Sequence, residues 1–222
     1  GYTGLWTALT LKEREPDLEV VVLEADECGL GPSGRNGGFV HGYWSYLPRL
    51  RESFGDEAAL AVAHVGDRIV PGIREFCRRY DADVWLREAG MLRVSAAPAQ
   101  DDAVGDEVEA AHELGAGEEA VLLEGDALAA RISSPVFRKG VFMRDGATIQ
   151  PARLVRALRR AVIASARVHE HSRATRIDDR RVETEHGLVR AREIVVATNA
   201  AAAGWQPLSR KLTVFGSYVV LT

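Results

Sequence analysis

The sequence has 222 residues, enough for one large domain or two small ones, with 46% hydrophobic and 27% charged residues, as in ordinary globular proteins. A formal net charge of −4 does not favour a nucleic-acid partner, and no apolar run reaches the ~20 residues of a membrane-spanning helix. The only cysteines, Cys28 and Cys77, lack CxxC spacing. They argue against a disulfide scaffold or a zinc site and favour a reducing compartment, so we expect a cytoplasmic protein.

The first third of the sequence predicts a helix, a buried strand, a glycine-rich loop and a long helical region. Apolar residues at helical spacing predict a helix over residues 2–15, and the β-branched run at 18–23 predicts a buried strand. Residues 29–42 contain too much glycine for a regular element. Residues 56–80 read as helical, with a break expected at Pro71-Gly72.

The middle of the sequence predicts mixed helix and strand. We expect strand over residues 84–95 around a turn at Ala89-Gly90, and again over 136–143. Helices are expected at 101–114, where an acidic first turn suits the helix dipole, at 124–131, and at 151–165, where Pro151 fits the first helical position.

In the last quarter of the sequence, apolar and polar residues alternate, which is typical of β-strands. Four short strands are expected at residues 168–172, 174–178, 181–185 and 188–191, followed by a buried strand at 193–198 and a strand-like run at 212–221. The order of elements predicts an α/β protein in which one domain is interrupted by a second, α+β domain.

The opening residues and Glu24 together resemble half of a dinucleotide-binding fingerprint. Gly1 and Gly4 stand where the last two glycines of G-x-G-x-x-G would stand, and Glu24 ends the next strand 20 residues after Gly4. Such glycines admit a pyrophosphate at a helix N-terminus, and the carboxylate accepts hydrogen bonds from a ribose hydroxyl. Glu24 would repel a 2′-phosphate, so NAD or FAD is expected rather than NADP. The alternative is an ordinary tight packing site.

The loop after Glu24 favours FAD over NAD. Ser33, Arg35 and Asn36 are hydrogen-bond donors set among glycines, an arrangement suited to a flat ligand with many acceptors. Arg35 either neutralises a phosphate or pairs with an acidic neighbour. The alternative for the whole stretch is a mobile linker.

At this point the sequence resembles the FAD-dependent amine and amino-acid oxidase superfamily, which includes D-amino-acid oxidase, and within it the γ-glutamylputrescine oxidase-like branch. The resemblance spans nearly the whole chain, and its most discriminating part is Gly34-Arg35-Asn36-Gly37-Gly38. The matching stretches are residues 1–5, 22–25, 33–38, 145–147 with 150–154, and 195–200.

The resemblance implies the cofactor FAD and a set of residues that bind it. Ala174 falls where the family holds adenine through its backbone, although plain strand packing explains it nearly as well. Relative to the family, the chain lacks the first strand and the C-terminal half, so we expect a portion of a longer enzyme. The implied FAD-binding residues are Gly1, Gly4, Glu24, Ala25, Ser33, Gly34, Arg35, Asn36, Gly37, Gly38, Ala174, Ala197, Thr198 and Asn199.

The implied organisation is a Rossmann-like FAD-binding domain, residues 1–45 and 150–210, interrupted by a partial substrate domain, residues 46–149 and 211–222. The implied activity is oxidation of the C–N bond of a small amine or amino acid by hydride transfer to flavin. The alternatives are an NAD-dependent dehydrogenase and an FAD-binding module without turnover. No catalytic acid or base is assigned, because this chemistry does not require one.

Several other side chains are weaker candidates. His169 and His171 share one strand face, as metal ligands can, but surface histidines explain them better. His41 could approach the flavin or simply pack. The aromatic residues Tyr43, Trp44 and Tyr46 could form a cage for a cationic amine, although core packing is the more ordinary role. The arginines 153, 156, 159 and 160 are expected on a solvated helix face.

Overall fold

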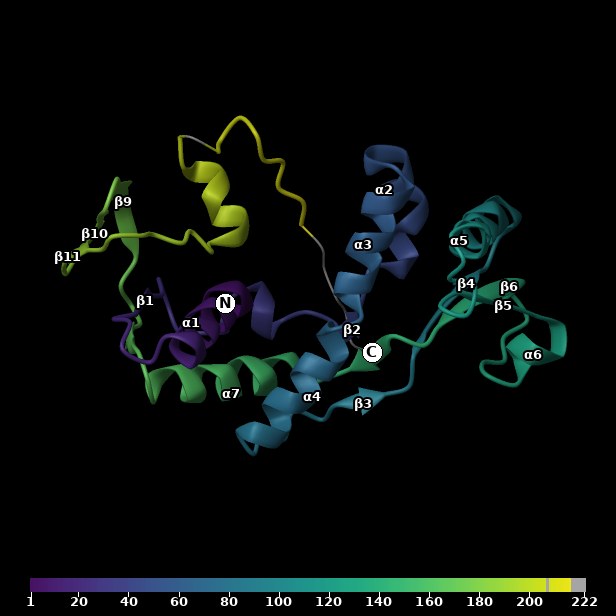
Figure 1. The fold of residues 1–222 in the computed structure, drawn as a ribbon, viewed down its shortest axis with the longest axis horizontal. Helices are drawn as coiled ribbons and strands as arrows, with labels where there is room; N and C mark the ends of the chain where they lie inside the picture. Colours follow the sequence, from purple (N-terminus) through teal and green to yellow (C-terminus); the bar gives the residue numbers. More distant parts are fainter. Residues whose placement is uncertain (207, 217–222) are drawn as a thin grey trace. The chain divides into compact units, whose positions relative to one another are not determined.

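The computed structural model describes residues 1–206 and 208–216. The chain forms two compact units, each built from separate stretches of sequence (Figure 1). The first unit contains residues 1–37, 82–84 and the chain from residue 150, and the second contains residues 38–81 and 85–149. Among the described residues, no helix is long and apolar enough to cross a bilayer.

Two helices of the first unit pack against each other, α1 (Tyr2–Arg14) and α7 (Pro151–Ile163) (Figure 1). Both were predicted. Helix α7 begins where the Gln150 side chain accepts a hydrogen bond from the Arg153 amide at 2.7 Å, with Pro151 in the first turn. Each helix buries one apolar stripe, and the buried side chains are Leu5, Ala8 and Leu9 on α1 and Pro151, Leu154, Val155, Ala157, Leu158, Ala161 and Val162 on α7.

A short parallel strand pair accompanies these helices. Strand β1 (Val21–Leu23) pairs with β8 (Arg167–His169), so that Leu23 lies opposite His169. Backbone bonds continue past the strands: the Glu24 amide donates to the His169 carbonyl at 2.9 Å, and the Ser172 amide donates to the Glu24 carbonyl at 2.8 Å. The pairing therefore fixes Glu24 at the carboxyl end of β1.

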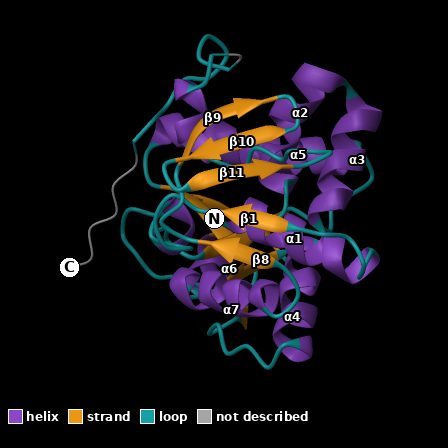
Figure 2. Cartoon of the chain, turned by 90° about the vertical axis from the view of Figure 1, so that its left-hand side faces the viewer, coloured by secondary structure: helices purple, strands orange, loops and turns teal. Residues whose placement is uncertain are grey.

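An antiparallel meander follows, as predicted (Figure 2). It contains β9 (Ala174–Asp178), β10 (Arg181–Thr184) and β11 (Gly187–Arg190). The strand expected at residues 193–198 is wrong, because no described strand pairs with this segment, and Val195 is 61% exposed. A 3₁₀ segment, Asn199–Gly204, comes next. Residues 212–216 form no strand, and the rest of the run expected at 212–221 lies outside the described residues.

Residues 82–84, which lie between two stretches of the second unit in the sequence, belong to the first unit. Ala82 and Val84 are buried, and the Val84 carbonyl accepts the Gln150 amide at 2.9 Å. Arg153 donates to the carbonyl and the carboxylate of Asp83 at 3.1 and 2.9 Å. Residues 82–84 are thus anchored to the start of α7.

The helices of the second unit correct two expectations. The region at 56–80 breaks at Asp67-Arg68, not at Pro71-Gly72, because Pro71 lies in the first turn of the next helix, where its missing N–H is not needed. A helix at residues 47–54 was not predicted. The helices are α2 (Leu47–Phe54), α3 (Asp56–Gly66), α4 (Ile69–Arg79), α5 (Asp101–Glu113) and α6 (Gly125–Ala129).

The second unit also has two antiparallel sheets, one of which begins inside the stretch expected to be irregular. The first has the order β2 (Phe39–His41), β7 (Gly146–Thr148), β3 (Arg87–Glu88). The second has the order β4 (Met91–Ser95), β6 (Lys139–Met143), β5 (Val121–Glu124). The core cluster of this unit includes Trp44, Leu47, Ala59, Ala63, Val104, Ala111, Val141 and Met143.

Glu107 on α5 is a carboxylate inside this unit. It is 4% exposed and contacts Arg93, yet its Oε2 atom has no hydrogen-bond partner among the described residues. Burial raises the pKa of Glu107 from 4.5 to about 7, against the opposing attraction of Arg93. The folded chain therefore holds a proton on this group that the unfolded chain releases.

We predict that the variant Glu107→Gln gains stability relative to the parent as pH rises from about 4.5 to about 7. Over this window the unfolded parent ionises Glu107 while the folded parent keeps it protonated, so the parent loses on the order of 2 kcal/mol. Urea unfolding followed by tryptophan fluorescence at several pH values measures the difference. Glu109→Gln, exposed on the same helix, is the control and shows a constant difference. The same constant difference for Glu107→Gln would contradict the assignment.

Candidate cofactor-binding site

The first turn of α1 presents free backbone donors. The Tyr2 amide donates to Ser33 Oγ at 3.0 Å. The amides of Thr3 and Gly4 have no acceptor among the described residues, as is usual for the first amides of a helix. A Cβ atom on Gly1 would lie 2.9 Å from Ser33 Oγ, so a side chain there would fill the space before the helix. This end of α1 can accept an anion.

The Glu24 carboxylate lies at the same place. Its Oε2 atom is 3.4 Å from the Gly1 nitrogen, and its Oε1 accepts the Asp26 amide at 3.4 Å. The half-buried Ala25 follows it. Because the Ser172 amide is bonded to the Glu24 carbonyl, the chain leading to Ala174 is anchored beside this carboxylate, and Ala174 itself is exposed at the start of β9. The structure thus brings Glu24 to the start of α1.

The loop at residues 33–36 is held by its own contacts. Asn36 Nδ2 donates to the carbonyls of Pro32 and Ser33 at 3.1 and 3.0 Å, closing the 3₁₀ turn Pro32–Gly34. A Cβ on Gly34 would lie 2.1 Å from the Gly29 carbonyl oxygen, a collision of backbone with side chain. Asn36 and Gly34 therefore stabilise the loop itself, a role that is separate from any contact with a ligand.

Arg35 is placed differently from its neighbours. Its side chain is exposed and makes no hydrogen bond or ion pair with any described residue, so the pairing with an acidic neighbour considered above does not occur there. Gly37 is exposed and ends the first stretch of its unit, while Gly38, with a φ of 75°, begins the second unit. The guanidinium of Arg35 remains available to an anion.

The segment at 197–199 approaches the helix from another part of the sequence. The Cβ atom of Ala197 would be 3.5 Å from a Cβ on Gly4, an ordinary van der Waals contact. Thr198 precedes the 3₁₀ segment, and Asn199 has a left-handed φ of 48°. Ala197 is therefore beside the first turn of α1, and Thr198 and Asn199 are exposed next to it in the chain.

Sequence reasoning missed the network that fixes the loop after Glu24. Glu170 Oε1 accepts the Cys28 amide and Arg159 Nε, both at 2.8 Å. Bonding to Arg159 lowers the pKa of Glu170 to about 2, and burial, with Glu170 nearby, raises the pKa of the Cys28 thiol to about 11. Arg159, expected on a solvated face, is thus a structural partner. The contact between Cys28 and Glu170 spans 142 positions of the sequence, so no local signal could reveal the network.

Tyr2 was also missed. Its hydroxyl donates to the Pro151 carbonyl at 2.9 Å, which ties the first turn of α1 to the first turn of α7. Burial raises the pKa of Tyr2 to about 12, so the phenol stays neutral. This contact helps to fix the end of α1 at which the free amides lie.

Of the weaker candidates in the second unit, some lie in the core and some at the surface. Trp44 is 2% exposed and donates to Asp67 Oδ1 at 2.8 Å, so its role is packing, not a substrate cage. Tyr43 and Tyr46 are exposed, and the half-buried His41 ring stacks on Tyr46 with centroids 6.3 Å apart.

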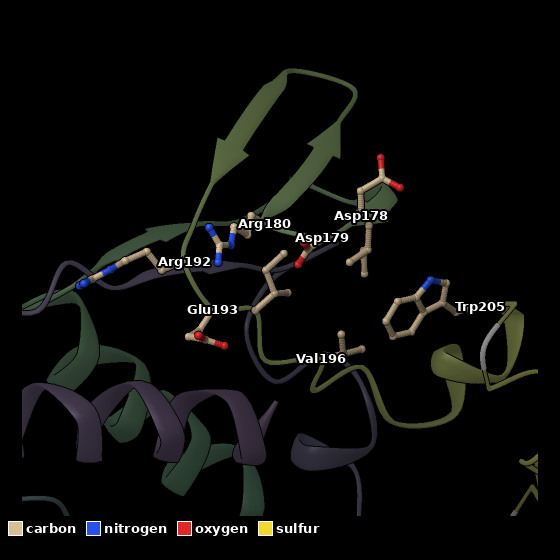
Figure 3. A pocket seen from close by; sticks show the side chains of 9 residues that line it. Asp178, Asp179, Arg180, Arg192, Glu193, Val196 and Trp205 are labelled. Carbon is tan, nitrogen blue, oxygen red and sulfur yellow. The ribbon is translucent and has the colours of Figure 1, made fainter.

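A surface hollow of about 480 Å³ lies between the meander and the segment at 192–196 (Figure 3). None of the predicted FAD-binding residues lines it. Asp178, on its rim, is already paired with Arg176 and Arg181 at 2.9 and 3.2 Å, and Asp179 and Glu193 add negative charge. Arg180 and Arg192 also line the hollow, so its charge is mixed, and because it contains none of the predicted FAD-binding residues we assign it no part in nucleotide binding.

The comparison with protein families decides the assignment. The model of the FAD dependent oxidoreductase family, DAO, matches residues 1–222. The chain belongs to this family. FAD is accordingly its cofactor, and the residues at the start of α1 fit it: they offer free amides, a glycine whose missing side chain leaves space before the helix, and an adjacent carboxylate.

Two curated proteins are similar to this chain in sequence. Gamma-glutamylputrescine oxidoreductase from Escherichia coli (strain K12) is 32% identical over 208 residues, which are 90% of this chain and 47% of that protein. The probable oxidoreductase OrdL from Rhizobium meliloti (strain 1021) is 26% identical over 217 residues, 94% of this chain and 50% of that protein. The chain spans about half the length of these relatives.

Solved structures show the same fold. Glycine oxidase from Geobacillus kaustophilus matches with a TM-score of 0.71 at 18% identity, covering 90% of this chain and 54% of that one. L-proline dehydrogenase from P. horikoshii matches with a TM-score of 0.69 at 19% identity, covering 94% and 53%. The predicted mixed α/β fold is therefore confirmed.

Two glycines in one loop provide a test of the site's construction. We predict that Gly34→Ala lowers the free energy of unfolding by about 1–3 kcal/mol, because its Cβ collides with the Gly29 carbonyl. Gly31→Ala is the matched control: no atom lies within 4 Å of its Cβ, and its φ of −80° suits alanine. Thermal unfolding compares the variants. Equal stability of the two variants would show that the loop is not packed in this way.

Proposed function

We propose that the protein containing this chain is an FAD-dependent oxidoreductase that oxidises the C–N bond of an amine or amino acid. One observation carries the proposal: the free amides of Thr3 and Gly4, the Glu24 carboxylate and Ser33 meet at one end of α1. The activities of the similar proteins support the substrate class, since these proteins include a gamma-glutamylputrescine oxidoreductase and a glycine oxidase. When bound, FAD supplies the acceptor for the hydride that leaves the carbon beside the substrate nitrogen.

The roles of the chain's residues follow from their chemistry. The amides at the start of α1 would donate to the pyrophosphate, where the helix dipole also favours negative charge. Glu24 would accept hydrogen bonds from the adenosine ribose and exclude a 2′-phosphate. Arg35, which has no partner among the described residues, would offset the phosphate charge. Ala174, Ala197, Thr198 and Asn199 would complete the surroundings of the cofactor through backbone and short side chains.

We further propose that the first compact unit is a Rossmann-like cofactor domain and the second a partial substrate domain. The parallel pair β1–β8 with α1 and α7 packed together supports the first assignment. The compact units divide the chain at Gly37–Gly38, earlier than the expected residue 45, and at Ile149–Gln150. Residues 211–216 group with the first unit.

We also propose a reducing compartment, the cytoplasm, for this protein. The support is that Cys28 and Cys77 are both free thiols in the structure. Burial keeps the Cys28 thiol neutral, because its pKa is raised to about 11, and a neutral thiol reacts slowly.

The activity is tested with the complete natural protein carrying its flavin. Anaerobic mixing with a panel of amines and amino acids bleaches the visible flavin absorption if one of them is oxidised. An intact flavin that no amine reduces would favour a binding module without turnover. A protein that binds NADH but no FAD would overturn the assignment altogether.

We predict that Glu24→Ala in the same protein weakens FAD binding about ten- to a hundredfold, because a hydrogen bond accepted by a charged group is lost. Titration of the apoprotein with FAD, followed by flavin fluorescence, measures the dissociation constant. Glu27→Ala, an exposed carboxylate three positions along the same loop, should leave it unchanged. Unaltered affinity in Glu24→Ala would remove Glu24 from the site.

A further inference from the structure

The chain that follows β1 is bonded to the chain that follows β8, which lies beside it in the first unit (Figure 2). The carbonyls of Glu24 and Asp26 accept the amides of residues 172 and 171, each at 2.8 Å. At Cys28 a side chain takes over this role, because Glu170 Oε1 accepts the Cys28 amide at 2.8 Å. The segment from Glu24 to Cys28 is therefore held at three alternate residues.

Arg159 on α7 holds Glu170 in this position. Its Nε atom donates to Glu170 Oε1 at 2.8 Å and its Nη2 atom donates to Oε2, so one guanidinium engages both carboxylate oxygens. The Glu170 side chain is only 16% exposed. The bonds from Arg159 are the main reason that the pKa of Glu170 is lowered to about 2, so the pair stays charged at neutral pH.

The same face of α7 supports the loop a little further along. Val155 lies four residues before Arg159 and therefore on the same side of the helix. A Cβ atom on Gly29 would lie 2.4 Å from Val155 Cγ1, and Gly29 has a left-handed φ of 100°. The Gly29 carbonyl in turn contacts Gly34, in the 3₁₀ turn that contains Ser33. Helix α7 is thus the support on which this loop rests.

Cys28 lies between the Arg159–Glu170 pair and the candidate cofactor site. Burial, first of all, and then the charges of Glu170 and Glu24 raise the pKa of its thiol to about 11. Both carboxylates are therefore near Cys28, and Glu24 Oε2 is also 3.4 Å from the Gly1 nitrogen at the start of α1. Only three residues separate Cys28 from Glu24, so a shift of the backbone at Cys28 also moves Glu24.

We propose that Arg159 and Glu170 are positioning residues that set the affinity for FAD by holding the Glu24 carboxylate at the start of α1. Neither side chain needs to touch the cofactor: Arg159 orients Glu170, Glu170 fixes the backbone at Cys28, and the backbone places Glu24. Hydrogen bonds weaken steeply when their geometry is distorted, so a displaced Glu24 binds a ribose poorly. The inference rests on the proposed function for the identity of the ligand, and it concerns the first unit alone.

The test is a double-mutant cycle in the complete natural protein, in which FAD is titrated into each apoprotein. Arg159→Gln should weaken FAD binding tenfold or more when Glu24 is present. In the Glu24→Ala background the same change should cost less than about threefold, because no carboxylate remains to be misplaced. Arg159→Lys keeps the charge without the fork of donors and should recover part of the affinity. Arg156→Gln, an exposed arginine on the same helix, is the control and should bind FAD as the parent does.

A second variant separates positioning from stability. Arg159→Gln leaves Glu170 without its partner and lowers stability for that reason too. The combined variant Arg159→Met, Glu170→Met removes both charges and keeps side chains of similar length. It should melt near the temperature of the parent apoprotein and still bind FAD at least tenfold more weakly.

Hydrogen exchange of the apoprotein gives a readout that needs no cofactor. The amides of residues 25–29 should exchange faster in the combined variant than in the parent, because the Cys28 amide has lost its acceptor. The amides inside α1 should exchange at unchanged rates.

Two results would overturn the assignment of Arg159 and Glu170. Equal losses of FAD affinity in both Glu24 backgrounds would show that the pair only stabilises the fold, and parent-like affinity in the folded combined variant would show that it positions nothing. A parent protein that binds no FAD overturns the proposed function and this inference together. A parent that binds FAD but oxidises no amine contradicts the proposed activity alone, because the cycle measures binding.

Discussion

The candidate cofactor site depends on a shortage of hydrogen-bond acceptors at the start of α1. A helix leaves its first amides without internal partners, and among the described residues only Tyr2 obtains one, from Ser33. Two further amides remain oriented along a dipole that attracts negative charge. The strand pairing of β1 then holds a carboxylate, Glu24, next to the same turn. A phosphate bound there would accept hydrogen bonds from the helix end and would be repelled by Glu24. The Glu24 carboxylate can therefore contact the uncharged, hydroxyl-bearing ribose of a nucleotide but not its phosphates.

The sequence predicted those features that depend on local pattern. Helices α1, α5 and α7 have apolar stripes at helical spacing, and the meander has alternating residues with turns between them, so each contains its own signal. The predictions that failed concern features that depend on tertiary contacts. The apolar run at 193–198 resembles a strand but has no partner among the described strands, and β2 forms in a glycine-rich stretch because β7, distant in sequence, pairs with it. The helix break at Asp67 coincides with the bond from Trp44, which no local pattern reports.

The candidate site was predictable in part for the same reason. Glu24 and the opening glycines are recognisable by spacing, because a nucleotide imposes a fixed distance between helix start and strand end. The structural role of Gly34 and Asn36 within the loop was not predictable from the sequence. It depends on Gly29 and on two carbonyl groups whose positions follow only from the fold. The same holds for Glu170, which orders the chain behind Glu24 from 142 positions away. A residue in a recognised motif can thus serve the loop itself more than its ligand.

Residues 82–84 belong to the first unit although the second unit surrounds them in the sequence. This arrangement constrains how the chain folds and how it can be truncated. Their backbone is bonded to Gln150, and Val84 is 1% exposed, so the first unit is incomplete until a segment from the middle of the second is in place. The first unit therefore cannot close before residue 150 has been synthesised, which favours late, cooperative folding of this unit. Replacing residues 38–149 by a short linker would also remove part of the remaining unit's interior, so the two units cannot be separated by a single excision.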